Sequence, residues 1–163
     1  MEKEWKEKIN VSLIYFNGSM WKQKCGSILE VVGKTGGNDY LVKFADSPVF
    51  TAQPKEIKSG GVKDRNLPSV AGVGYMSYGK YVAKTNRKNT PAYEVWRGIL
   101  RRCYDPSSKN WYNYGGVGIT VHHDWHNFQN FAEWYYHNKK RLSSKETTKF
   151  DVDKDLRGRK IYS

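Results

Sequence analysis

Short hydrophobic runs separated by polar turns dominate the first third of the chain. Residues 26–35, 39–44 and 48–53 are rich in β-branched and aromatic residues, and KTGGND and ADSP separate them. Runs of this length between turn-forming residues are typical of strands. We therefore expect residues 1–65 to form a small antiparallel β module, either a sheet or a partly closed barrel. The opening EKEWKEKI is expected to form a short helix.

Helical spacing of hydrophobic positions begins after residue 89. Thr90 is a favourable N-cap and Pro91 suits the first helical position. The apolar stripe that follows ends at DPSS, residues 105–108, and Glu94 is placed to pair with Arg97 at i+3. The stripe predicts a helix whose core face consists of Tyr93, Trp96, Leu100 and Cys103.

The same spacing recurs in residues 126–141, which predict a second helix with Asn127 as its N-cap. Between the helices we expect a turn at YGGVG and a short strand at residues 119–121. At the end of the chain we expect two strands, residues 150–154 and 160–163, joined by a basic turn. The apolar stripe of the second helix is Phe128, Phe131, Ala132 and Tyr135.

The glycine-rich, basic stretch in the middle of the chain lacks either periodicity, so residues 66–89 are predicted to be a linker. Its tyrosines, Tyr75, Tyr78 and Tyr81, either stack on bases or pack on the fold. The predicted fold class is α+β, with the β module at 1–65 followed by a compact helix–strand–helix–β-hairpin domain at 90–163.

Charge points to a polyanionic partner. The 163 residues include 28 Lys or Arg and 16 Asp or Glu, a formal net charge of +12. Residues 66–142 hold 11 of the basic and 4 of the acidic residues. This concentration favours nucleic acid over an anionic membrane surface; the alternative is that the cations only keep the chain in solution. The partner that we expect is DNA, duplex rather than single-stranded. The candidate phosphate contacts are Lys80, Lys84, Arg87, Lys88, Arg97, Arg101, Arg102, Lys139, Lys140 and Arg141.

Other compartments and partners are less favoured by the sequence. No apolar run is long enough to span a bilayer, so we expect no membrane partner, and the N-terminus lacks the apolar core of a secretion signal. Two cysteines, Cys25 and Cys103, do not suggest a disulfide scaffold.

Three blocks of the sequence are familiar. YEVWRGILRRCYDP, YNYGGVGITVHHDWHNFQNFAEWY and FDVDKDLRGRKIYS resemble, in this order, short phage and prophage proteins described as HNH-type or homing-endonuclease-like. The likeness extends over residues 68–163, and LVKFADSPVF and IKSGGVKDRN resemble the front module of many phage members. It implies an HNH-like DNA-binding domain and a protein that works in the cytoplasm of an infected bacterial host.

The resemblance also implies how DNA is contacted. In related three-stranded domains a sheet enters the groove, and a basic turn between two strands suits that role. The alternative is an ordinary solvated hairpin. The candidate residues are Lys154, Arg157, Arg159 and Lys160.

Whether the chain is an enzyme is left open by the sequence. An HNH nuclease needs a His to activate water and a divalent ion, here Mg²⁺ or Mn²⁺. Because His122 and His123 are expected at a strand end, their side chains should point to opposite faces, so that at most one faces a given site. The histidines and carboxylates available to such a site are His122, His123, His126, Asp124, Asp151, Asp153 and Asp155. Of these, the candidate catalytic residues are His122, His123, His126 and Asp153, and the candidate metal ligands are His123, Asp153 and Asp155.

Two departures from the family pattern weaken the case for catalysis. Lys154 stands where active members carry a His, and many relatives have Cys-Glu where this chain has His122-His123. Structural zinc on Cys103 and the histidines is not favoured, because such sites use paired short spacings. The sequence therefore predicts a DNA-binding protein with a degenerate catalytic site. The alternatives are a metal-dependent endonuclease and a phage protein that binds a host protein.

Overall fold

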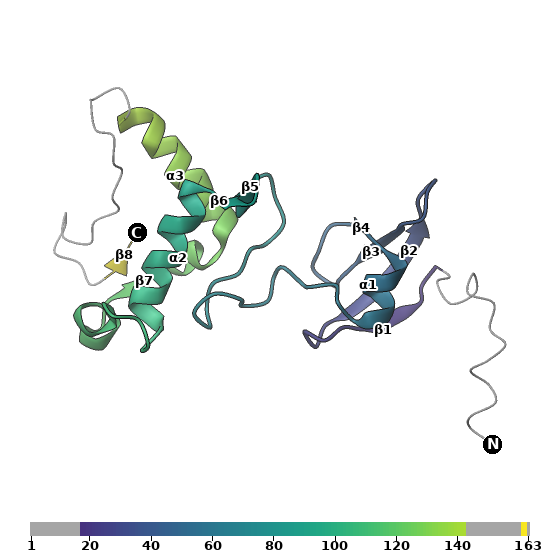
Figure 1. Cartoon of the computed structure of the whole chain (residues 1–163), viewed down its shortest axis with the longest axis horizontal. Coiled ribbons are helices and arrows are strands. Elements are labelled where there is room, and N and C mark those ends of the chain that lie inside the picture. The colour runs from purple at the N-terminus through teal and green to yellow at the C-terminus, as the bar shows by residue number, and fades with distance from the viewer. Residues whose placement is uncertain (1–16, 143–160, 163) are drawn as a thin grey trace, which may run out of the picture. The chain divides into compact units, whose positions relative to one another are not determined.

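The computed structural model describes residues 17–142 and 161–162, and for residues 139–142 only the backbone. The chain divides into two compact units, residues 1–64 and 65–163 (Figure 1). Unit 1 is a four-stranded antiparallel sheet, and unit 2 contains helices and two small sheets, so the α+β class is confirmed. In the described part of the chain, no helix is both long and apolar enough to cross a bilayer.

Unit 1 is a meander in which each strand pairs with the next. Its strands are β1 (Met20–Lys22), β2 (Ile28–Lys34), β3 (Tyr40–Lys43) and β4 (Phe50–Ala52), in that order. Alternate residues of β2 and β3 are buried, as a sheet with one covered face requires. The antiparallel sheet is confirmed, but β1 and the helix α1 (Pro54–Ser59) were not predicted. The helix expected at EKEWKEKI lies outside the described residues.

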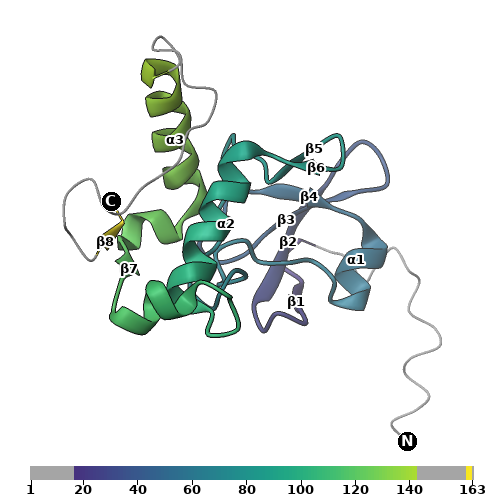
Figure 2. The same cartoon turned by 60° about the vertical axis from the view of Figure 1, so that its left-hand side comes forward.

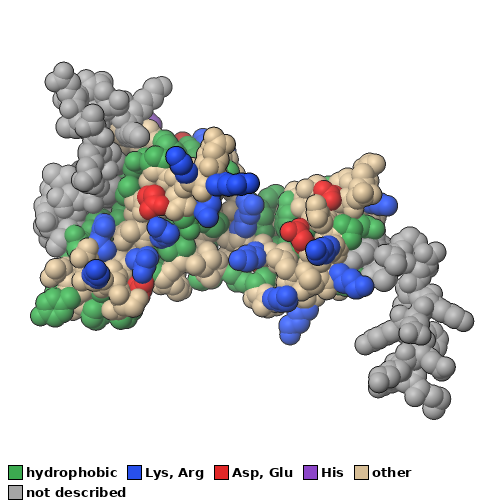
Figure 3. Space-filling view, in the orientation of Figure 1, with side chains coloured by type: hydrophobic (Ala, Val, Ile, Leu, Met, Phe, Trp, Pro, Cys, Tyr) green, Lys and Arg blue, Asp and Glu red, His purple; other side chains and the backbone are tan. Residues whose placement is uncertain are grey.

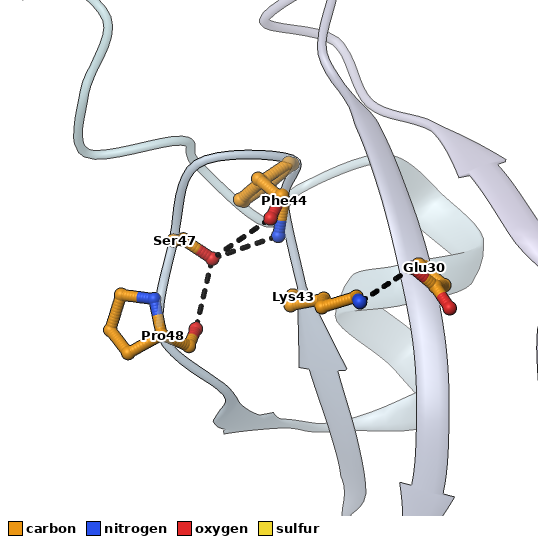
Figure 4. Close-up of polar contacts among 5 residues, drawn as sticks. All are labelled: Glu30, Lys43, Phe44, Ser47 and Pro48. Carbon is orange, nitrogen blue, oxygen red and sulfur yellow. Dashed lines mark hydrogen bonds and ion pairs between the residues drawn. The ribbon is translucent and has the colours of Figure 1, made fainter.

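Polar contacts join β2 to β3 and close the turn after β3 (Figure 4). Glu30 and Lys43 are direct cross-strand partners, and their side chains form an ion pair of 3.2 Å. In the turn, the Ser47 hydroxyl accepts a hydrogen bond from the Phe44 N–H at 2.8 Å and donates to the Pro48 carbonyl at 2.9 Å. These bonds close the ADSP turn that the sequence indicates.

Unit 2 is built on two helices, α2 (Pro91–Tyr104) and α3 (Phe128–Leu142) (Figure 2). They pack against each other through aromatic side chains. Trp96 and Phe128 are buried with ring centroids 5.2 Å apart. Thr90 and Asn127 are at the predicted N-terminal ends. The Thr90 hydroxyl does not cap α2, however, but donates to the Val82 carbonyl. The predicted core faces are confirmed, except that Tyr93 is half-buried.

The sequence predicted a linker at residues 66–89, but in the structure these residues belong to unit 2. Val70 and Gly74 are buried, and Tyr75 forms a bridge with Asn127 at the start of α3. A Cβ on Gly74 would lie 2.3 Å from a Leu100 methyl group, so only glycine permits this close approach to α2. The pattern looked irregular because the segment packs through single residues rather than through a periodic face.

A parallel strand pair lies near the C-terminal end of α2. In it β7 (Thr120–Val121) pairs with β8 (Ile161–Tyr162). The predicted strands therefore exist at 120–121 and 161–162, and the strand expected at 150–154 lies outside the described residues. Short 3₁₀ helices precede and follow β7, namely η3 (Trp111–Asn113), η4 (Gly115–Val117) and η5 (His123–His126).

Candidate nucleic-acid interface and metal site

A two-stranded hairpin, β5 (Lys84–Thr85) and β6 (Lys88–Asn89), leads into α2 (Figure 1). Its loop consists of Asn86 and Arg87, with φ of 51° and 63°. Positive φ at both loop residues is the geometry of a type I′ turn, which matches the twist of the flanking strands. Glycine is the usual second residue, and an L-residue in this region costs roughly 1–2 kcal/mol. The chain nevertheless places an arginine there.

The hairpin carries three exposed cations. Lys84, Arg87 and Lys88 are exposed, and the stretch from 84 to 88 contains no acidic residue. Among residues 17–142 and 161–162, no carboxylate lies within ion-pair distance of any of them. Because side chains alternate along a strand, Lys84 and Lys88 lie on opposite faces of the ribbon, with Arg87 at its tip.

Hydrogen bonds hold the segment before the hairpin on α3. The Gln129 amide accepts from the Tyr81 N–H at 3.0 Å and donates to the Tyr81 carbonyl at 2.9 Å and the Met76 carbonyl at 3.2 Å. At the base of the hairpin, the Thr90 N–H donates to the Ala83 carbonyl at 2.8 Å. The hairpin is therefore anchored on both sides, while its tip remains exposed.

The other described candidates are engaged in pairs. Arg97 lies 3.1 Å from Glu94, as the spacing predicted, and Arg101 lies 3.2 Å from Asp105. Lys80 lies 2.8 Å from Glu133, and this hydrogen bond is the main reason that the pKa of Glu133 is lowered. Figure 3 shows the same interleaving, with acidic side chains among the basic ones on the visible face of unit 2.

Arg102 has a structural role. Its guanidinium lies 5.2 Å from the ring centroid of Tyr114, and its charge acts on the hydroxyl of Tyr162 in β8. Burial raises the pKa of the Tyr162 hydroxyl, which therefore stays protonated. Arg102 joins α2 to the β7–β8 sheet, and it is half-buried rather than presented to solvent.

Three ligand-type side chains converge just after β7. Single nitrogen or oxygen atoms of His122, His123 and Asp124 all lie within 4.8 Å of one another. His123 Nε2 is 2.9 Å from one Asp124 carboxylate oxygen, and His122 Nδ1 is 3.5 Å from the other. The two imidazole rings lie with centroids 4.5 Å apart. This arrangement of two imidazoles and one carboxylate can hold a metal ion.

The prediction that His122 and His123 point to opposite faces is wrong. The strand β7 ends at Val121, and the chain turns at once into η5. In this tight turn consecutive side chains no longer alternate, and both rings reach Asp124. Asp124 was among the candidate carboxylates in the sequence, but Asp153 and Asp155 were preferred as metal ligands; the His-His-Asp sequence directly after a short strand was the available signal.

His126 does not join this cluster. Its Nε2 lies 3.2 Å from the Tyr104 hydroxyl, which also accepts from the Val121 N–H at 2.9 Å. Burial lowers the pKa of His126, with a smaller contribution from His123 and His122. The Nε2 atom of His126 therefore takes part in the contact between Tyr104 of α2 and Val121 of β7.

Cys103 lies in the core on α2, and burial raises the pKa of its thiol to about 11. A metal-ligating thiolate is disfavoured in that setting.

Several of the predicted site residues are outside the part of the chain whose side chains the structure describes. They are Lys139, Lys140, Arg141, Asp153, Lys154, Asp155, Arg157, Arg159 and Lys160.

Comparison of the chain with models of protein families, with curated proteins and with solved structures finds no match. The resemblance to HNH-type phage proteins therefore stays a prediction.

Proposed function

We propose that this chain is a DNA-binding protein that contacts duplex DNA with the β5–β6 hairpin. The observation that carries the proposal is the group of three exposed cations, Lys84, Arg87 and Lys88, on an anchored ribbon. A cation without a carboxylate partner can contact a phosphate and release a counterion from DNA without losing an existing interaction. A cation that is already paired must first give up its carboxylate partner, which reduces its net contribution to affinity.

The shape of the hairpin favours duplex over single-stranded DNA. A major groove admits a two-stranded ribbon and has a phosphate backbone on each side. Lys84 and Lys88 lie on the two faces of the ribbon and Arg87 at its tip. A ribbon in the groove would thus meet phosphates on both faces, while a single strand would use only one of them.

The proposed fold type and origin of the protein rest on the resemblance of its sequence to HNH-type phage proteins. We propose that unit 2 is a variant of the HNH-like fold and that the protein is of phage origin. In this variant the basic hairpin that reads DNA precedes α2. The terminal basic segment with Lys154, Arg157, Arg159 and Lys160 would add further phosphate contacts.

Fluorescence anisotropy with the full chain tests the proposal. Labelled duplex DNA, single-stranded DNA and RNA are titrated at several salt concentrations in EDTA, which excludes metal-dependent effects. We expect the tightest binding to duplex and a steep fall with salt. Variants that each remove one hairpin cation are compared with Lys55→Ala on α1. This control removes one positive charge from an exposed site in unit 1 and should leave the affinity for DNA unchanged. No duplex binding at low salt, with a host protein recovered by the chain, would favour the host-binding alternative.

The second candidate function is metal-dependent cleavage of DNA. It is favoured by the convergence of His122, His123 and Asp124 in a unit with an excess of basic residues. A bound ion can stabilise the leaving oxygen of a phosphodiester. Incubation with plasmid and Mg²⁺ or Mn²⁺ tests it: nicking should disappear in His123→Ala and persist in His137→Ala. Nicking that survives His123→Ala would remove this candidate.

A further inference from the structure

We infer that His122, His123 and Asp124 form a surface site for a divalent first-row transition ion of the Zn²⁺ type. The ligand set shares only His123 with the set that the family resemblance implies. The site does not depend on DNA binding or on cleavage, since it follows from the side chains of one turn.

The separations between the donor atoms suit a small ion. Two ligand atoms on one tetrahedral zinc lie about 3.3 Å apart, because each metal–ligand bond is about 2.0–2.1 Å. His123 Nε2 lies 2.9 Å from one Asp124 carboxylate oxygen and His122 Nδ1 lies 3.5 Å from the other, so a small rotation of the exposed carboxylate would bring one oxygen near this distance from both nitrogens. The His123 side chain is 81% exposed, so it is free to rotate and close the remaining gap between the imidazole nitrogens.

The backbone that carries the ligands is held on both sides. The His122 N–H donates to the Tyr162 carbonyl at 2.9 Å, and the Trp125 N–H donates to the His122 carbonyl at 2.9 Å. The Trp125 side chain is buried, and the Trp125 backbone carbonyl accepts a hydrogen bond from Trp96 Nε1 at 2.6 Å. Binding therefore needs little ordering of the chain, which favours affinity.

The donor types select the class of ion. Mg²⁺ and Ca²⁺ prefer oxygen ligands, whereas imidazole nitrogen suits Zn²⁺, Ni²⁺, Co²⁺ and Cu²⁺. Three protein ligands leave a coordination position for water or another oxygen donor, as in open zinc sites. The exposure of His123 and Asp124 places that position at the surface.

Calorimetric titration of the full chain with ZnCl₂, NiCl₂ and MgCl₂, without DNA, tests the inference. We expect one Zn²⁺ or Ni²⁺ per chain and much weaker Mg²⁺ binding. Each of His122→Ala, His123→Ala and Asp124→Asn should weaken Zn²⁺ binding about tenfold or more. The matched control is His137→Ala, an exposed histidine on α3, which should bind as the wild type does. Circular dichroism of each variant checks that the fold is kept.

Two results would overturn the inference. One is equal Zn²⁺ binding, or none, in the wild type and the three ligand variants. The other is binding that is lost in Asp153→Ala but kept in His122→Ala and Asp124→Asn, which would assign the ion to the ligands predicted from the sequence. Because hairpin variants should bind Zn²⁺ normally, failure here is distinguishable from failure of the DNA-binding proposal.

Discussion

The hairpin β5–β6 and the helix α2 that follows it carry three cations each, but the two elements present them differently. On α2, Arg97 and Arg101 lie beside carboxylates and Arg102 packs on Tyr114. On the hairpin, Lys84, Arg87 and Lys88 are exposed, and no ion pair to any of them exists within the described residues. A count of basic residues treats the two elements as equal, whereas their surroundings make only one of them a candidate phosphate contact.

The reason for the difference is local geometry. Residues three and four apart on a helix are neighbours, so Glu94 and Asp105 reach Arg97 and Arg101. A two-residue turn leaves no such neighbours, and the hairpin sequence from 84 to 88 supplies no acidic residue.

Removal of all three hairpin cations should have the largest effect. With a slope of about −0.9 per phosphate contact, each contact is worth roughly eightfold in affinity at 0.1 M salt. The combined change Lys84→Ala, Arg87→Gly and Lys88→Ala should therefore weaken duplex binding roughly 500-fold by anisotropy. A loss below tenfold would mean that the hairpin is not the main contact.

Arg87→Gly alone should separate binding from stability. Glycine relieves the left-handed conformation at the tip, so the melting temperature should be unchanged or higher. Affinity for duplex DNA should fall roughly eightfold, since one phosphate contact is lost. Thermal unfolding and anisotropy are measured on the same preparation. A stable variant with wild-type affinity would exclude Arg87 from the contact.

Gln129→Ala should show whether the anchoring of the hairpin matters. The change leaves the Tyr81 and Met76 backbone groups without their side-chain partner, and should lower the free energy of unfolding by about 1–3 kcal/mol. Affinity should fall less than in Arg87→Gly, because the cations remain. Urea unfolding gives the first quantity, and Gln53→Ala in unit 1 is the control. A loss of affinity larger than that of Arg87→Gly would contradict this order.

Arg101→Gln should have the smallest effect, and Arg87→Gln is its matched partner. Because Arg101 is already paired with Asp105, we expect its replacement to change affinity less than about twofold at 0.15 M salt, where distant charges are screened. Equal losses for the two glutamine variants would show that net charge, rather than the hairpin, determines binding.

Elements set by local pattern were predictable from the sequence. Runs of β-branched residues correctly predicted three of the four strands of unit 1. The spacing of Trp96, Leu100 and Cys103 correctly predicted the buried face of α2. Asn127 starts α3 as expected, where its side chain accepts from the Gln129 N–H at 2.9 Å. In each case the signal lies within one turn or one strand.

Features that depend on distant contacts were not predictable. The packing of residues 66–89 rests on Gly74 against Leu100 and on Gln129 against Tyr81, and nothing in the local pattern indicates either. The β5–β6 hairpin was missed because its loop is Asn-Arg rather than the usual Asn-Gly. The His122–Asp124 cluster was missed because the strand alternation was extended to His122 and His123, whereas β7 ends at Val121 and the chain turns into η5 at His123.

The salt dependence of duplex binding tests the central claim most directly. The slope of log K against log salt concentration is measured in EDTA for the wild type, Arg101→Gln and the triple hairpin variant. We expect the slope of the triple variant to be shallower than that of the wild type by about 2.7, the value for three phosphate contacts. Arg101→Gln should keep the wild-type slope. A triple variant with the wild-type slope would contradict the central claim.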